Sequence, residues 1–137
     1  MAEDANYTAL SSFVKRCRAV VQGEIDLMND WEGKVIVDRR AACRLTRRHI
    51  QDDVLPEVDD VQSKLDDLSG QPGAVKRPPA KAALDQLAQY DADLQRRGAL
   101  IVSNLSEDDF QDALVATKQN AENAADLASQ TYDDCVT

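Results

Sequence analysis

The sequence is poor in aromatic residues: six occur among 137, namely one Trp, three Tyr and two Phe. A core with so few rings must be filled mainly by Leu, Val, Ile and Ala. Stretches that are rich in Ala and poor in β-branched residues suit helices better than sheets. The scarcity of aromatic residues also leaves none interleaved with basic residues for stacking on nucleic-acid bases.

Catalytic and metal-binding motifs are absent as well. His49 is the only histidine, and no Glu-x-x-His motif accompanies it, which excludes the di-metal site of some helical bundles. Cys43 lies six residues away on the same expected helix, about 120° round, so the two cannot form a nucleophile–base pair. No glycine-rich phosphate loop or calcium-binding pattern occurs. We therefore expect a protein that is not an enzyme, with no metal and no cofactor.

The three cysteines are an odd number with no Cys-x-x-Cys pair, so they predict neither a disulfide scaffold nor a zinc site. We expect three free thiols, with Cys135 near the C-terminus the reactive one. Hydrophobic runs long enough to span a membrane are missing, and the first four residues do not resemble a signal peptide. We expect a cytoplasmic protein, with a secreted mature form as the alternative.

Apolar residues recur at three- and four-residue steps and predict four helices, at residues 8–30, 35–68, 80–102 and 107–133. Gly33 is expected to cap the first helix, and Pro56 to kink or divide the second. Ser106 is a suitable N-cap for the fourth. Residues 69–79, with two Gly and three Pro, predict a loop.

These elements predict one all-α domain over residues 1–137, arranged as an up-down-up-down four-helix bundle. The alternative is a set of elongated helical hairpins that dimerise to complete a bundle.

The tripeptide Trp31-Glu32-Gly33, between the first two expected helices, resembles the Trp-x-Gly turn of the small helical-hairpin proteins of type VII secretion. The resemblance covers three residues. The chain is longer than that family and has four helices. It also lacks the family's Tyr-x-x-x-Asp/Glu signal, because Val136 stands four residues after Tyr132. The tripeptide therefore assigns no family.

The most distinctive feature is a cluster of arginines in an acidic chain. Between Lys34 and His49 there are six basic residues and one Asp, whereas the whole chain carries a net charge of −9. Two interpretations follow. One is an internal ion pair between Arg47 and Asp91, which both fall on apolar stripes. The other is a basic patch that binds an anion. Its candidate residues are Lys15, Arg16, Arg18, Arg40, Arg44, Arg47 and Arg48.

Beside the arginines, Val37, Ala41 and Leu45 form an apolar strip on the side of the helix away from its core stripe. The strip either packs on a neighbouring helix or binds an amphipathic helix of a partner. We expect a non-enzymatic protein-interaction module, such as an adaptor, a regulator or an immunity-type inhibitor. Its partner would be a basic protein or one that presents an acidic or amphipathic helix, and a homodimer is a further alternative. The other function considered is binding of a phosphate ligand or nucleic acid through the basic patch, although the net charge disfavours nucleic acid.

Overall fold

The computed structural model describes residues 2–98 and 102–136, and every regular element within these ranges is helical. The all-helical prediction is thus confirmed. The elements are α1 (Ala2–Lys34), α2 (Val37–His49), a π-helical turn η1 (Ile50–Val54), α3 (Leu55–Asp67), α4 (Lys81–Gly98), a 3-10 turn η2 (Val102–Asn104) and α5 (Glu107–Val136). The end of the predicted helix at residues 80–102 includes 99–101, which lie outside the described residues.

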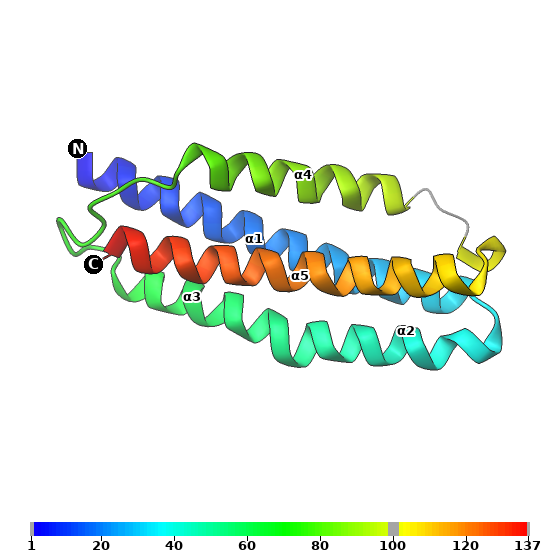
Figure 1. Ribbon diagram of the computed structural model, residues 1–137. Coiled ribbons are helices and arrows are strands. Elements are labelled where there is room, and N and C mark those ends of the chain that lie inside the picture. Colours follow the sequence, from blue (N-terminus) through cyan, green and yellow to red (C-terminus); the bar gives the residue numbers. More distant parts are fainter. Residues whose placement is uncertain (1, 99–101, 137) are drawn as a thin grey trace.

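The helices lie side by side along one long axis (Figure 1). α1 and α5 pack against each other in the middle. α4 covers this pair on one side, and α2 with α3 covers it on the other. α1 consequently contacts all the other long helices, whereas α4 and α2 are separated by the central pair. This separation decides which charged residues can meet.

The first helix is longer than predicted and does not end at Gly33. α1 continues through Lys34, and the Val35 amide still donates a 2.8 Å hydrogen bond to the carbonyl of Trp31. The positive-φ glycines among the described residues are Gly70 and Gly73, both in the 69–79 loop. The chain turns instead at Ile36, which is extended (φ −66°, ψ 157°). The glycine C-cap prediction was wrong, and the Trp-x-Gly tripeptide is helical rather than a turn.

Pro56 divides the second helix by way of a π-helical turn. The Leu55 amide bonds the carbonyl of Ile50, five residues back, as a π turn requires. Proline has no amide hydrogen, and its ring would clash with the carbonyl four residues earlier in a regular α-helix. The wider turn just before Pro56 relieves this clash, so the helical path continues from α2 into α3.

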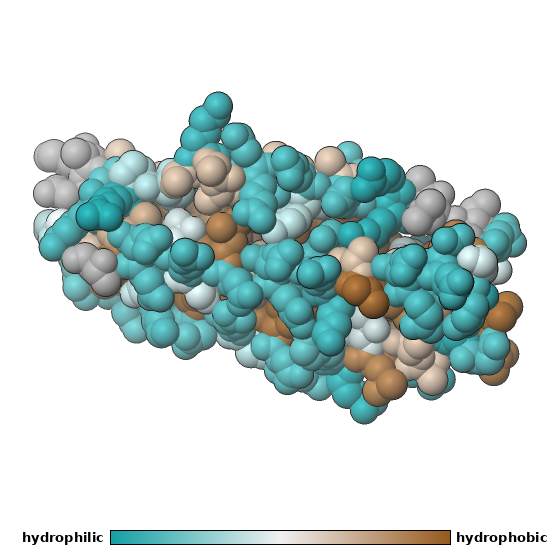
Figure 2. Space-filling model, in the orientation of Figure 1, coloured by the Kyte–Doolittle hydropathy of each residue, from teal (hydrophilic) through white to brown (hydrophobic). Residues whose placement is uncertain are grey.

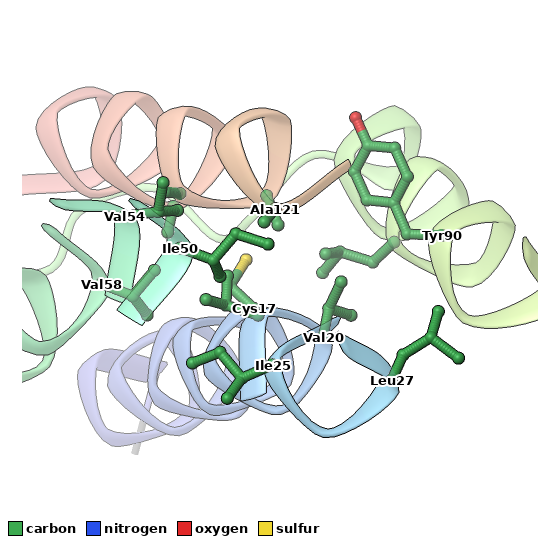
Figure 3. Packing of buried hydrophobic residues seen from close by; sticks show 14 of the residues in the cluster. Cys17, Val20, Ile25, Leu27, Ile50, Val54, Val58, Tyr90 and Ala121 are labelled. Carbon is green, nitrogen blue, oxygen red and sulfur yellow. The ribbon is translucent and has the colours of Figure 1, made fainter. Parts of the chain in front are cut away.

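The core is aliphatic and alanine-rich, as the composition predicts. Figure 3 shows Cys17 of α1, Ile50 of η1 and Ala121 of α5 close together in it, and all three are fully buried. On α5, Ala124, Ala125 and Ala128 are also at 0% exposure. Small side chains let helix backbones approach closely, which explains how α5 can sit in the middle of the molecule. Ser106 caps α5 as predicted, because its Oγ accepts a 3.2 Å bond from the amide of Asp109.

Candidate functional site

The arginine cluster lies on α2, and part of it is used to attach α2 to its neighbours. Arg39 reaches the start of α5: its Nε lies 3.1 Å from a carboxylate oxygen of Glu107, and its Nη1 donates a 2.9 Å bond to the carbonyl of Leu105. Its guanidinium also stacks 4.9 Å from the centre of the Phe110 ring. Arg39 was not among the predicted site residues, and it serves as a structural link.

Arg47 binds the end of α1. Its Nη1 forms an ion pair with Glu32 and donates a 2.9 Å bond to Oδ1 of Asn29. Arg44 approaches the same Glu32 carboxylate at 3.4 Å, with half of its side chain still exposed. One acid therefore compensates two arginines. An excess of positive charge remains on this face.

The predicted ion pair between Arg47 and Asp91 is wrong. Asp91 of α4 pairs with Arg16 of α1 instead. A pair between Arg47 and Asp91 requires the second and third predicted helices to face each other. They do not, because α1 and α5 separate α4 from α2 (Figure 1).

The predicted basic patch of helices 1 and 2 does not assemble on one face. Arg16 faces α4, and Arg18 pairs with Asp59 of α3 at 2.8 Å. Lys15 is exposed on α1. Three of the predicted residues do share one face. Arg40, Arg44 and Arg48 form a row at four-residue steps on α2, and all three are exposed.

The apolar strip beside this row is not covered by any described part of the chain. Val37 is 75% exposed and Leu45 is 65% exposed, and Ala41 between them is exposed too. Four-residue steps rotate by about 40°, so the three lie in one sector of about 80°. Ile36, which precedes the helix, is 47% exposed as well. Figure 2 shows brown and tan residues gathered toward the right-hand end of the molecule, over α2 and the neighbouring part of α5.

At the end of the strip the surface is hollowed. Leu45, Arg48, His49, Asp52 and Asp53 line an open pocket with a volume of about 350 Å³. His49 in this lining is held on both sides. Its Nδ1 lies 2.9 Å from Oδ2 of Asp53, and its Nε2 lies 2.7 Å from Oε1 of Glu122 on α5. Both ring nitrogens have a carboxylate partner, so His49 joins α2 to α5.

The most deeply buried charged network among the described residues was not predicted from the sequence. Glu24 of α1 is fully buried, and both of its carboxylate oxygens accept from Arg97 Nη1 of α4, at 3.1 and 3.2 Å. Arg97 also donates to Thr117 of α5 at 3.1 Å. Burial raises the pKa of Glu24 to about 7, against the opposing effect of the Arg97 charge. The signal was present as a carboxylate on the apolar stripe of the first helix.

All three cysteines are free thiols, as predicted, and all three are buried. Burial raises the pKa of Cys17 to about 12 and that of Cys43 to about 11. Cys135, expected to be reactive, is 2% exposed, and burial raises its pKa too. A buried thiol with a raised pKa is inert, so that expectation was wrong.

Within residues 2–98 and 102–136, no three His, Cys, Asp or Glu side chains come together as metal ligands would. Nor is any described helix long and apolar enough to cross a membrane. Comparisons with protein-family models, with curated proteins and with solved structures found no match to this chain.

Proposed function

We propose that the protein is a non-enzymatic interaction module that binds another protein through the outer face of α2. The observation that carries the proposal is the exposure of Val37 and Leu45, at 75% and 65%, on one side of a helix. Leaving two large aliphatic side chains in water costs about 1.5–3 kcal/mol each relative to burial. A partner that covers them recovers this free energy. Adaptors, regulators and immunity-type inhibitors are classes that act in this way.

The chemistry of the partner follows from the charges beside the strip. Arg40, Arg44 and Arg48 run along the same helix. Arg44 shares the Glu32 carboxylate with Arg47, and Arg48 lines the pocket with Asp52 and Asp53. An apolar strip with a cationic border is complementary to an amphipathic segment with acidic flanks. A nucleic acid fits less well, since the cations of α1 point elsewhere and the chain carries a net charge of −9.

We also propose that the long helices follow the up-down-up-down order, with α2, η1 and α3 acting as one helix. The two-residue link between α1 and α2 supports this order. So do the start of α1 and the end of α5, which lie at the same end of the molecule in Figure 1. A short link favours antiparallel neighbours.

The test is affinity capture from the native cell extract with the intact protein as bait. The variant carries Val37→Glu with Leu45→Glu, and the matched control is Leu84→Glu, a 47% exposed leucine on α4. We expect one partner protein to be captured by the wild type and the control, and lost with the double variant. Equal capture by all three would contradict the proposal. Oligonucleotide binding that weakens steeply with salt would favour the anion-binding alternative instead.

A further inference from the structure

The exposed face of α2 continues across a seam onto α5. Two side-chain pairs join these helices: Arg39 with Glu107, and His49 with Glu122. The residue numbers rise in the same direction on both helices, so α2 and α5 run alongside each other between these two links. The seam between the links is therefore bounded by residues 39–49 on one side and 107–122 on the other.

Val115 lies on the α5 side of this seam. It follows Glu107 by eight residues and precedes Glu122 by seven, which places it midway between the two links. At about 100° per residue it is only about 20° from Glu122 and about 80° from Glu107 around the helix. Val115 thus lies at the outer edge of the sector of α5 that faces α2, and it is 61% exposed.

Leu45 lies on the α2 side. It precedes His49 by four residues, so it is about 40° from the residue that contacts α5. It is 65% exposed and also lines the pocket with Arg48 and His49. The two exposed aliphatic side chains, Leu45 and Val115, therefore border one seam from opposite sides. Figure 2 shows apolar residues of α2 and α5 together on this face.

We propose that the seam between α2 and α5 is the binding groove for an acidic amphipathic helix of a partner protein, which packs its apolar side on Leu45 and Val115. This inference rests on the proposed function and assigns the partner's shape and position. The partner's carboxylates extend toward Arg44 and Arg48 on α2 and toward Lys118, an exposed cation three residues after Val115. Asp112, one turn before Val115, is exposed as well and keeps acidic residues away from that end.

A second copy of the chain is a poorer occupant on charge grounds. Pairing two α2 faces would bring together two rows of Arg40, Arg44 and Arg48, and like charges across an interface oppose association. An acidic helix instead finds the arginine row on the α2 border and Lys118 on the α5 border, and its carboxylates avoid Asp112 and the Asp52–Asp53 end of the pocket. A helix also presents side chains at three- and four-residue steps, which suits two apolar contacts on separate elements.

The experiment measures binding of fluorescent helical peptides to the purified full chain by anisotropy. The peptides share one leucine stripe and differ in their flanks, which are Glu, Gln or Lys. We expect the Glu peptide to bind and the Lys peptide to fail. Val115→Glu and Leu45→Glu should each weaken binding at least about tenfold, which corresponds to about 1.4 kcal/mol. Leu84→Glu, on α4, should leave it unchanged, and circular dichroism verifies that each variant is folded.

The outcomes separate this inference from the proposed function. If Leu45→Glu weakens binding and Val115→Glu does not, the partner does not bind in the seam between α2 and α5, while α2 remains the binding face. If the Glu and Lys peptides bind alike, or neither binds, the partner is not an acidic helix and the inference is overturned. The capture experiment then still tests the proposed function independently. A dimer of the free protein that Leu45→Glu dissociates in sedimentation analysis would overturn the inference in favour of a second copy.

Discussion

Arg47 and Arg48 are adjacent in the sequence and differ in what they contact. The Arg47 side chain is 29% exposed and binds Glu32 and Asn29, whereas Arg48 is exposed at the rim of the pocket. We expect Arg47→Ala to lower the free energy of unfolding by about 1–2 kcal/mol, because a half-buried Glu32 loses its closest partner. Arg48→Ala should change it by less than about 0.5 kcal/mol. Urea unfolding of both variants tests this, and equal effects would contradict it.

At Glu24, burial makes the stability depend on pH. Its pKa is raised from 4.5 to about 7, with desolvation as the main cause. The folded carboxyl group therefore holds a proton between pH 4.5 and 7 that the unfolded chain releases. The contribution of Glu24 to the free energy of unfolding is then largest below pH 4.5, and it declines as the pH rises to about 7. The total decline is about 3 kcal/mol, at about 1.4 kcal/mol per pH unit.

The measurement compares urea unfolding of the wild type and of Glu24→Gln between pH 4.5 and 8. Glutamine keeps an acceptor for Arg97 and cannot titrate, so the difference between the two proteins isolates this carboxyl group. We expect the wild type to lose stability relative to the variant as the pH rises. Parallel pH profiles would show that Glu24 is charged throughout and that Arg97 dominates over desolvation.

At the scale of the helices, Gly33 is a position where a substitution should stabilise the protein. It is exposed within α1, and a Cβ built on it meets no atom within 4 Å. Gly33→Ala should therefore stabilise the protein by about 0.5–1 kcal/mol, because alanine loses less backbone entropy in a helix.

Gly70 is the matched control, as its surroundings are equally open but its φ is +84°. Gly70→Ala should destabilise, by about 1–2 kcal/mol. Thermal unfolding of the two variants tests both signs, and a destabilising Gly33→Ala would contradict the first.

The helices could be predicted because the signals for them are local. Apolar residues at three- and four-residue steps marked each one, and Ser106 marked the start of α5 through a bond to an amide three residues away. Helix ends were less predictable. Gly33 allows a left-handed cap but does not require one, and its helix runs on to Lys34.

Pairing between helices could not be read from the same signals, since it depends on which helices become neighbours. Arg47 was assigned to Asp91 across a contact that the central pair of helices prevents. Glu24 was visible as a charge on an apolar stripe, but its partner Arg97 is 73 residues away. Likewise Val37 and Leu45 formed a strip in the sequence, and only the arrangement of the helices shows that no described part of this chain covers it.

At the scale of the whole molecule, the central position of α1 and α5 implies unequal local stability. α4 lies on one side of this pair and buries only three apolar residues, Ala83, Leu87 and Tyr90, out of 18. Its last turn is held by Arg97, which binds Glu24 and Thr117 beneath it. α5, by contrast, is packed between neighbours along much of its length. Segments with few buried apolar contacts open at lower free energy than the core.

We therefore expect the amides of α4 to exchange with solvent at least about tenfold faster than those in the middle of α5, which corresponds to a difference of about 1.4 kcal/mol in opening free energy. Arg97→Gln should accelerate exchange in α4 further, because it removes the positive charge opposite a buried Glu24. Arg96→Gln is the control, since Arg96 is exposed and pairs with Asp93 of its own helix. Hydrogen exchange followed residue by residue by NMR makes the comparison. Uniform protection across α4 and α5 would mean that the bundle opens as one cooperative unit and that the buried pair does not control α4 separately.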